Sequence, residues 1–230
     1  MKNNNILKNK KLIIFDFDGT LIDSGPDLAH ALNYTLSQLE LKTYSEEIIH
    51  GWVGNGAKTL VQRGLLGKTD IDDQDIDAEV LENALNIFLT YYSEHVCIKT
   101  ITYPNVSETL KTLKNDGYMM AIVTNKPHAF IKPILEKLEL DDLFEYYIGG
   151  DSLKEKKPSP APLLHVCETL NIDINDSVMV GDSKNDILSA NACSMQSIGV
   201  SYGYNYGEDI NIYNPTVVLN DFKDILRVIK

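Results

Sequence analysis

The chain alternates between short, unbroken apolar runs and longer segments in which apolar residues recur at helical spacing. The apolar runs predict strands, because such stretches are typical of strands buried on both faces of a parallel sheet. These runs are 12–15, 119–123, 146–148, 178–180, 197–200 and 216–219. Helical spacing covers 106–115, 129–138, 160–170 and 186–192, and a last helix is expected after the final strand. Strands that alternate with helices in this way predict an α/β fold with a doubly wound parallel sheet.

A different pattern occupies the segment between the first and second strands. From about Asp23 to about Val96 the apolar residues recur only at helical spacing, so we expect helices there and no strand. This block therefore predicts an inserted, small α-helical cap, residues 23–96. The α/β core is expected to comprise residues 1–22 and 97–230. We expect the cap to hinge on the two connections, because closure over a site would exclude water from it.

Two acidic residues, Asp16 and Asp18, directly follow the first strand and precede a Gly19-Thr20 turn. Residues i and i+2 of an extended segment point the same way, and glycine then allows a sharp turn. Both acids should therefore face the crevice beyond the strand ends, where open α/β sheets bind ligands. Close carboxylates repel unless a cation lies between them, and Mg²⁺ accepts both carboxylate and phosphate oxygens. An ordinary turn is the alternative, but chance produces this pattern only about once in 10⁵ positions.

Further polar residues follow other predicted strands. Thr124 and Asn125 come after 119–123, and the acid-rich segment 181–186 comes after 178–180. Lys157 follows another lysine and precedes Pro158. Taken singly, these residues could be helix caps, turn residues or solvated side chains. In a wound sheet they converge on one edge with the two acids, so together they predict a single site.

In this order, the residues resemble the haloacid dehalogenase superfamily of phosphatases. The matching motifs are Asp16-x-Asp18-Gly19-Thr20, Thr124, Lys157 and Gly181-Asp182-Ser183-x-x-Asp186. The resemblance implies that Asp16 attacks phosphorus to form an aspartyl-phosphate. It implies that Asp18 protonates the leaving oxygen and then activates water. The helical insertion also matches the position of that superfamily's small cap.

The same resemblance implies roles for the remaining motif residues. Thr124 and Lys157 are expected to hold phosphate oxygens, and Thr20 and Asn125 to contact substrate. A Mg²⁺ ion is expected on Asp16, Asp182 and the backbone carbonyl of Asp18, with Asp186 as a supporting acid. The residues expected in catalysis are thus Asp16, Asp18, Thr124 and Lys157; those expected at the metal are Asp16, Asp18, Asp182 and Asp186; and those expected at the substrate are Thr20 and Asn125.

A narrower resemblance links the chain to the phosphoglycolate phosphatase branch of this superfamily. It rests on the stretches 23–29, 52–57, 123–127 and 202–208, and it implies 2-phosphoglycolate, a small phosphorylated and carboxylated metabolite, as substrate. Gly54-Asn55-Gly56 precedes a predicted helix, and glycine-rich helix amino termini bind anions. We therefore expect this loop to meet the substrate carboxylate, with Arg63 or Lys58 as helper. The alternative is that the loop only joins two helices and that Arg63 is solvated.

Composition narrows the range of partners and compartments. The 230 residues carry a formal net charge of −12, which argues against nucleic acid or an anionic membrane as partner. No apolar run is long enough to span a bilayer, and the lysine-rich start has no apolar segment typical of a signal peptide. Three cysteines without ligand spacing indicate a reducing, cytoplasmic compartment. A monomer and a homodimer both remain open.

Three classes of function are compatible with these residues. The first is a Mg²⁺-dependent phosphatase acting on 2-phosphoglycolate. The second is a broader sugar- or nucleotide-phosphate phosphatase, or a phosphomutase, of the same fold. The third is a catalytically silent binding protein, which is disfavoured because Asp16, Asp18, Lys157 and Asp182 are all present.

Overall fold

The computed structural model describes residues 7–72 and 76–229. Residues 1–6, at the start of the predicted core, residues 73–75, inside the predicted cap, and residue 230 lie outside the described part. Within that part, six strands form one parallel sheet in the order β5-β4-β1-β6-β7-β8. Their bounds are Leu12–Phe15 (β1), Met119–Val123 (β4), Tyr146–Ile148 (β5), Ser177–Gly181 (β6), Gln196–Val200 (β7) and Val217–Leu219 (β8). The predicted doubly wound α/β fold is confirmed.

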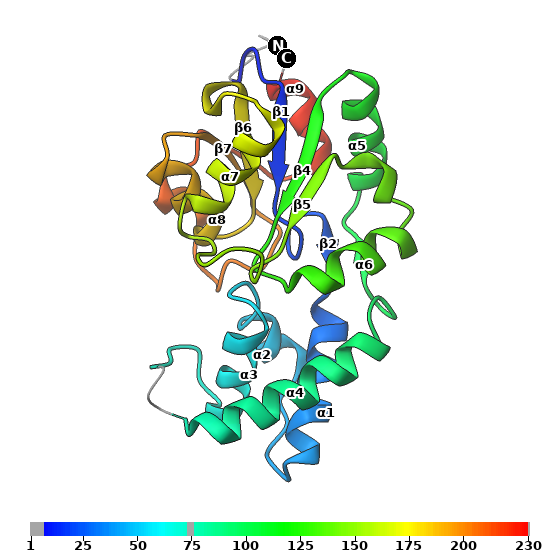
Figure 1. Cartoon of the computed structure of the whole chain (residues 1–230), viewed down its shortest axis with the longest axis vertical. Coiled ribbons are helices and arrows are strands. Elements are labelled where there is room, and N and C mark those ends of the chain that lie inside the picture. The colour runs from blue at the N-terminus through cyan, green and yellow to red at the C-terminus, as the bar shows by residue number, and fades with distance from the viewer. Residues whose placement is uncertain (1–6, 73–75, 230) are drawn as a thin grey trace.

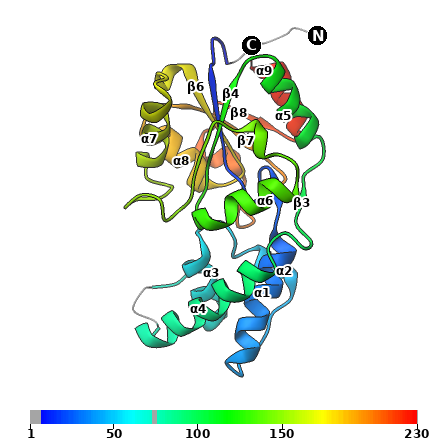
Figure 2. The same cartoon turned by 45° about the vertical axis from the view of Figure 1, so that its right-hand side comes forward.

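Helices cover both faces of this sheet (Figure 2). Alternate residues of β1 face opposite layers: Ile13 and Phe15 pack with the helices on one face, whereas Leu12 and Ile14 pack with those on the other. This double burial explains why the strand is an unbroken apolar run. The helices are Val106–Asn115 (α5), Ile131–Lys137 (α6), Ala161–Leu170 (α7), Lys184–Ala192 (α8) and Ile225–Val228 (α9). Short 3₁₀ helices span His128–Phe130, Asp141–Leu143, Ile174–Asp176, Ile210–Tyr213 and Phe222–Asp224.

A group of four helices lies beyond the carboxyl ends of the strands (Figure 1). They are Gly25–Gln38 (α1), Glu46–His50 (α2), Ala57–Leu66 (α3) and Ala78–Glu94 (α4). Their buried apolar residues, among them Leu32, Val61 and Phe88, pack in one cluster with residues of the sheet layer. We call this group the helical cap. Among the described helices, none combines the length and apolar composition needed to cross a membrane.

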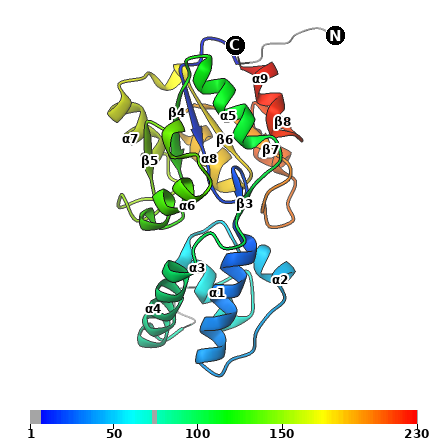
Figure 3. The ribbon, with the colours of Figure 1, turned by 90° about the vertical axis from the view of Figure 1, so that its right-hand side faces the viewer.

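Two neighbouring chain segments join the helical cap to the sheet layer (Figure 3). Ile22–Asp23 (β2) pairs antiparallel with Ile101–Thr102 (β3). Sequence analysis missed this pair, because two-residue strands have no periodicity to detect. The side chain of Asp27, in the first turn of α1, accepts hydrogen bonds from the backbone N–H groups of residues 98–100 at 2.9–3.1 Å. The two connections are therefore tied to each other; the predicted boundary at 22/23 falls within β2, and the one at 96/97 comes shortly before β3.

Candidate active site

Three adjacent strands end at the same place and carry the predicted catalytic residues. β1 lies between β4 and β6, so Asp16, Thr124 and Asp182 follow neighbouring strands. The backbone N–H of Asp16 still donates to the carbonyl of Val180, at 2.8 Å. Strand pairing thus holds the first acid beside the end of β6, which is why residues far apart in the sequence form one site.

A buried acidic cluster lies at this edge. Carboxylate oxygens of Asp16, Asp182 and Asp186 all lie within 4.8 Å of one another. Lys157 is 1% exposed, and its ammonium lies 2.9 Å from Asp16 Oδ1 and 2.6 Å from Asp186 Oδ1. The structure therefore brings three predicted metal residues and the predicted lysine together.

The charges of this cluster are unbalanced. Burial, together with the charge of Asp186, raises the pKa of Asp16 well above its ordinary value and the pKa of Asp182 to about 7. Burial opposes the charge of Lys157, but the nearby carboxylates outweigh it and raise the pKa of this lysine. One ammonium cannot neutralise three buried carboxylates. Because oxygen donors suit a hard divalent cation, these residues fit a divalent metal site.

Hydrogen bonds fix the two acids contributed by the 181–186 segment. Asp182 accepts from the Thr20 hydroxyl and from the backbone N–H of Tyr204, each at 2.7 Å. Asp186 accepts from the backbone N–H and hydroxyl of Ser183, at 3.0 and 2.8 Å, which caps α8. Its other oxygen accepts from Lys157, so its geometry suits the supporting role expected of it.

The turn after β1 depends on this packing. Gly19 has φ +89°, and a Cβ at this position would lie 2.4 Å from Asp182 Oδ2. Thr20, expected to contact substrate, is fully buried and lies outside the pocket described next, where its hydroxyl orients Asp182. The structure therefore gives Thr20 a positioning contact with the acidic cluster.

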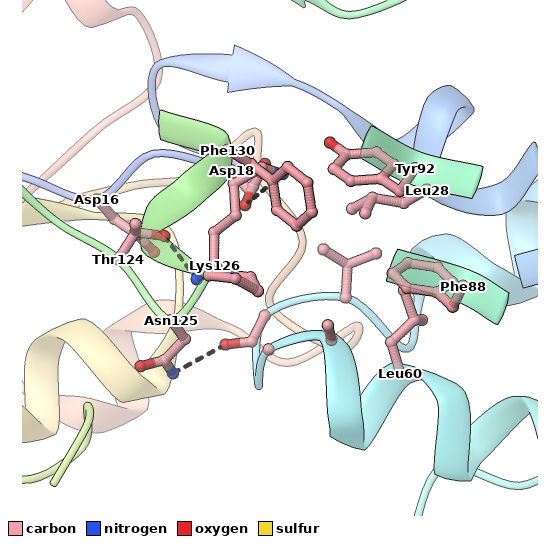
Figure 4. A pocket seen from close by; sticks show the side chains of 15 residues that line it. Asp16, Asp18, Leu28, Leu60, Phe88, Tyr92, Thr124, Asn125, Lys126 and Phe130 are labelled. Carbon is pink, nitrogen blue, oxygen red and sulfur yellow. Dashed lines mark hydrogen bonds and ion pairs between the residues drawn. The ribbon is translucent and has the colours of Figure 1, made fainter. Parts of the chain in front are cut away.

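A pocket lies between the sheet edge and the helical cap (Figure 4). Asp16, Asp18, Thr124 and Asn125 line its polar side. Its other side is mostly apolar and comes largely from the cap. The apolar lining comprises Leu28, Val53, Ala57, Leu60, Phe88, Tyr92, Pro127 and Phe130. The Asp18 carboxylate accepts a hydrogen bond from the Ser24 hydroxyl and pairs with the Lys126 ammonium at 3.0 Å.

The two residues after β4 connect parts of the site. Thr124 Oγ1 accepts from the backbone N–H of Lys126 at 3.1 Å. The Asn125 amide donates to the carbonyls of Gly54 and Lys157, each at 3.1 Å. Asn125 therefore joins the cap loop to the loop that carries the buried lysine.

The cap loop 54–56 is in contact with the core. Gly54 and Gly56 line the pocket, whereas the Asn55 side chain accepts a hydrogen bond from the Tyr206 hydroxyl. Gly56 has φ +89°, and a Cβ there would lie 2.8 Å from the carbonyl oxygen of Asn125. These contacts dock the cap onto the strand-end loops.

Arg63 lies elsewhere than expected. Its side chain is buried and donates to the carbonyls of Trp52, at 2.6 Å, and Thr69, at 2.9 Å. It is not among the residues that line the pocket. The structure thus places Arg63 as a brace within the cap, because the direction of a helical side chain depends on how the helix packs.

Sequence analysis included Lys126 and the loop after β7 among the stretches that carry the narrower resemblance, but it assigned no function to either. Lys126 follows Thr124-Asn125 directly, but a lysine before proline has the local pattern of a solvated residue. The loop contributes three tyrosines at alternate positions. Tyr202 donates to the carbonyl of Thr20 at 2.9 Å, Tyr204 donates to Asp23, and Tyr206 donates to Asn55. This loop therefore contacts the β1 turn, the connection to the cap, and the cap itself.

Known proteins are similar to this chain over most of its length. The model of the haloacid dehalogenase-like hydrolase family matches residues 13–200. Phosphoglycolate phosphatase of Colwellia psychrerythraea is 49% identical over 224 residues, which cover 97% of this chain and 99% of the relative. The protein of the same name from Psychrobacter arcticus is 49% identical over 218 residues, 95% of each chain.

Structural comparison leads to the same family. The crystal structure of a predicted phosphoglycolate phosphatase from Haemophilus somnus has a TM-score of 0.89 and 40% identity, and the match covers 96% of this chain and 98% of that one. The similarity therefore includes both the sheet layer and the helical cap. With the acidic cluster and its lysine in place, the chain belongs to the haloacid dehalogenase-like hydrolase family.

Proposed function

We propose that this protein is a Mg²⁺-dependent phosphatase that hydrolyses 2-phosphoglycolate to glycolate and phosphate. The observation that carries the proposal is the buried cluster of Asp16, Asp182 and Asp186 around Lys157, with Asp18 beside it at the pocket. The substrate is supported by the names of the relatives, two of which are 49% identical over almost the whole chain.

The first chemical step uses both acids of the β1 turn. A carboxylate oxygen of Asp16 attacks phosphorus, and the bond between phosphorus and the glycolate oxygen breaks. Asp18 gives its proton to that oxygen, so glycolate leaves as an alcohol. Lys157 offsets negative charge on Asp16 and on the transferring group. The product of this step is an aspartyl-phosphate.

The second step restores the enzyme. Asp18, now ionised, takes a proton from water as the water oxygen attacks phosphorus. The bond between phosphorus and Asp16 breaks, which releases phosphate and the free carboxylate. A Mg²⁺ ion held by Asp16, Asp182 and the Asp18 backbone carbonyl, with Asp186 in support, would neutralise phosphate oxygens when bound. Thr124 lines the same pocket and is proposed to hold a phosphate oxygen.

The helical cap is proposed to select the substrate. Gly56 and Ala57, at the amino terminus of α3, line the pocket, and free N–H groups at such a terminus favour an anion. We propose that Asn55, Asn125 and Arg63 support this loop through the contacts described above. The three free cysteines suit a reducing cytoplasm as the place of action.

The test is phosphate release from a panel of phosphate esters with Mg²⁺, beside Asp16→Asn and a control at an exposed acid, Asp141→Asn. We expect 2-phosphoglycolate to have a kcat/KM far above those of sugar and nucleotide phosphates. We expect Asp16→Asn to be inactive and Asp141→Asn to match the wild type. Similar kcat/KM values across the panel would favour a broad phosphatase. Transfer of the phosphoryl group back to a bound sugar would favour a mutase. No hydrolysis with any divalent metal would favour a silent binding protein.

A further inference from the structure

Lys126 is the cation that faces the substrate pocket. Among the described residues that line the pocket, it carries the one positive side chain. It is 4% exposed, and its ammonium lies 3.0 and 3.3 Å from the two carboxylate oxygens of Asp18. An ammonium has three N–H donors, so Asp18 does not exhaust its capacity. Lys126 can therefore hold a second anion in the pocket without leaving Asp18.

Tyr92 places a hydroxyl group at the same point from the opposite side. The ammonium of Lys126 lies over its ring, 4.9 Å from the centroid, and Figure 4 shows the hydroxyl of this cap residue pointing across towards the core. Tyr92 is 1% exposed, and its hydroxyl interacts with the Lys126 ammonium, which can only donate; no described residue accepts the O–H of Tyr92. Burial raises the pKa of Tyr92 to about 12, so the group is an O–H donor at neutral pH. An unpaired buried donor that lines a pocket is suited to a ligand acceptor.

We propose that Lys126 from the core and Tyr92 from the cap together bind the carboxylate of the substrate and so determine specificity for carboxylated phosphate esters. This inference rests on the proposed function, because it needs phosphate at Asp16 and the leaving oxygen at Asp18. In 2-phosphoglycolate the carboxylate is separated from that oxygen by a single methylene carbon. A group that touches Asp18 is therefore within reach of the carboxylate.

Other cations near the site are already engaged. Lys157 is held between Asp16 and Asp186, and Arg63 donates to backbone carbonyls inside the cap. The apolar cap residues around the pocket offer no charge. The loop 54–56 offers backbone N–H groups to the same anion but no charge, and its Asn55 side chain and the carbonyls of Gly54 and Asn55 dock the cap on the core. A carboxylate buried in this pocket would have its strongest available partner in Lys126.

The experiment compares two substrates of equal length, 2-phosphoglycolate and 2-hydroxyethyl phosphate, whose far end is neutral. Lys126→Met keeps the aliphatic stem and removes the charge, and Tyr92→Phe removes only the hydroxyl. We expect Lys126→Met to lower kcat/KM for 2-phosphoglycolate about 100-fold more than for 2-hydroxyethyl phosphate. We expect Tyr92→Phe to show a selective loss of about tenfold, mainly in KM. Lys126→Arg should retain most of the preference.

Binding provides a second readout. In the Asp16→Asn background, Lys126→Met should weaken the binding of 2-phosphoglycolate, measured by calorimetry. The affinity for inorganic phosphate should stay nearly unchanged. Equal losses of kcat/KM for 2-phosphoglycolate and 2-hydroxyethyl phosphate in Lys126→Met would overturn the inference. Lys126 would then only support Asp18. A selective loss in Gly54→Ala with Gly56→Ala, but not in Lys126→Met, would overturn it in favour of the cap loop. If the folded wild type hydrolyses neither ester, the proposed function fails first, and the calorimetry still tests the carboxylate site.

Discussion

The hydroxyl of Tyr206, on the loop after β7, donates a 2.7 Å hydrogen bond to the side-chain oxygen of Asn55 in the helical cap. The Asn185 amide donates to the same hydroxyl at 3.3 Å. Tyr206 and Asn55 are 151 positions apart. Because one belongs to the core and the other to the cap, their hydrogen bond forms only while cap and core are in contact. It connects a core loop directly to the loop that lines the pocket.

Removing this bond should weaken cap docking. We expect Tyr206→Phe to raise KM about fivefold, because a hydrogen bond of this kind contributes about 1 kcal/mol. Steady-state kinetics on 2-phosphoglycolate measures the effect, with Tyr213→Phe as the control. Asn55→Ala should have a similar effect, and the double variant should be no worse than either single one. Additive effects would show that the two residues act independently.

Removing the hydroxyl of Thr20 should lower the affinity for Mg²⁺ more than the affinity for substrate. Thr20→Val removes the hydrogen bond that orients Asp182, and we expect Mg²⁺ affinity to fall about tenfold to a hundredfold. Activity titrated against Mg²⁺ measures this affinity. Thr35→Val is the matched control, since Thr35 is also buried but bonds to a carbonyl within α1. An unchanged Mg²⁺ requirement in Thr20→Val would contradict the positioning role.

Metal stabilisation should depend on pH in a defined direction. The pKa of Asp182 is raised to about 7, mainly by burial, whereas an unfolded aspartate titrates near 3.8. Between these values the folded, metal-free protein holds a proton that the unfolded chain has released, so its stability falls as pH rises. Metal binding needs the ionised carboxylate, so the affinity for the metal increases as pH rises.

We therefore expect saturating Mg²⁺ to raise Tm more at pH 8 than at pH 5.5. Thermal unfolding with Mg²⁺ or with a chelator tests this at both values. Asp182→Asn should lose most of the Mg²⁺ effect at either pH. A shift in Tm that is the same at both pH values in the wild type would show that the cluster does not titrate on metal binding.

Asp27 should contribute strongly to stability through the connection it holds. Its buried carboxylate accepts from the backbone N–H groups of residues 98–100 and from the Thr100 hydroxyl. Because hydrogen bonds to a charged group are strong and the donors would be left unpaired, Asp27→Ala should cost about 2–4 kcal/mol. Urea unfolding measures the change. Glu82→Ala, at an exposed position of the cap, should stay within about 0.5 kcal/mol of the wild type.

Sequence patterns succeeded where the signal is local. The apolar run Leu12–Phe15 marked a strand buried on both faces, and the motif residues Asp16 and Lys157 lie in one cluster as their convergence on one sheet edge predicted. The pattern was less informative for single side chains. Thr20 and Arg63 were expected at the substrate, and the structure places both outside the pocket. Local sequence does not encode the rotation of α3, which directs Arg63 into the cap.

The sequence by itself determined the α/β class, the strands of the parallel sheet, the helical insertion and the family to which the motifs belong. These features follow from periodicity and from short motifs, which act over a few residues. Only the tertiary structure decided that Lys126 pairs with Asp18, 108 positions away, and that Thr20 holds Asp182, 162 positions away. Such contacts depend on which strands become neighbours and on how the cap packs over them. The distribution of charge and hydrogen bonds within the site is therefore a property of the folded chain.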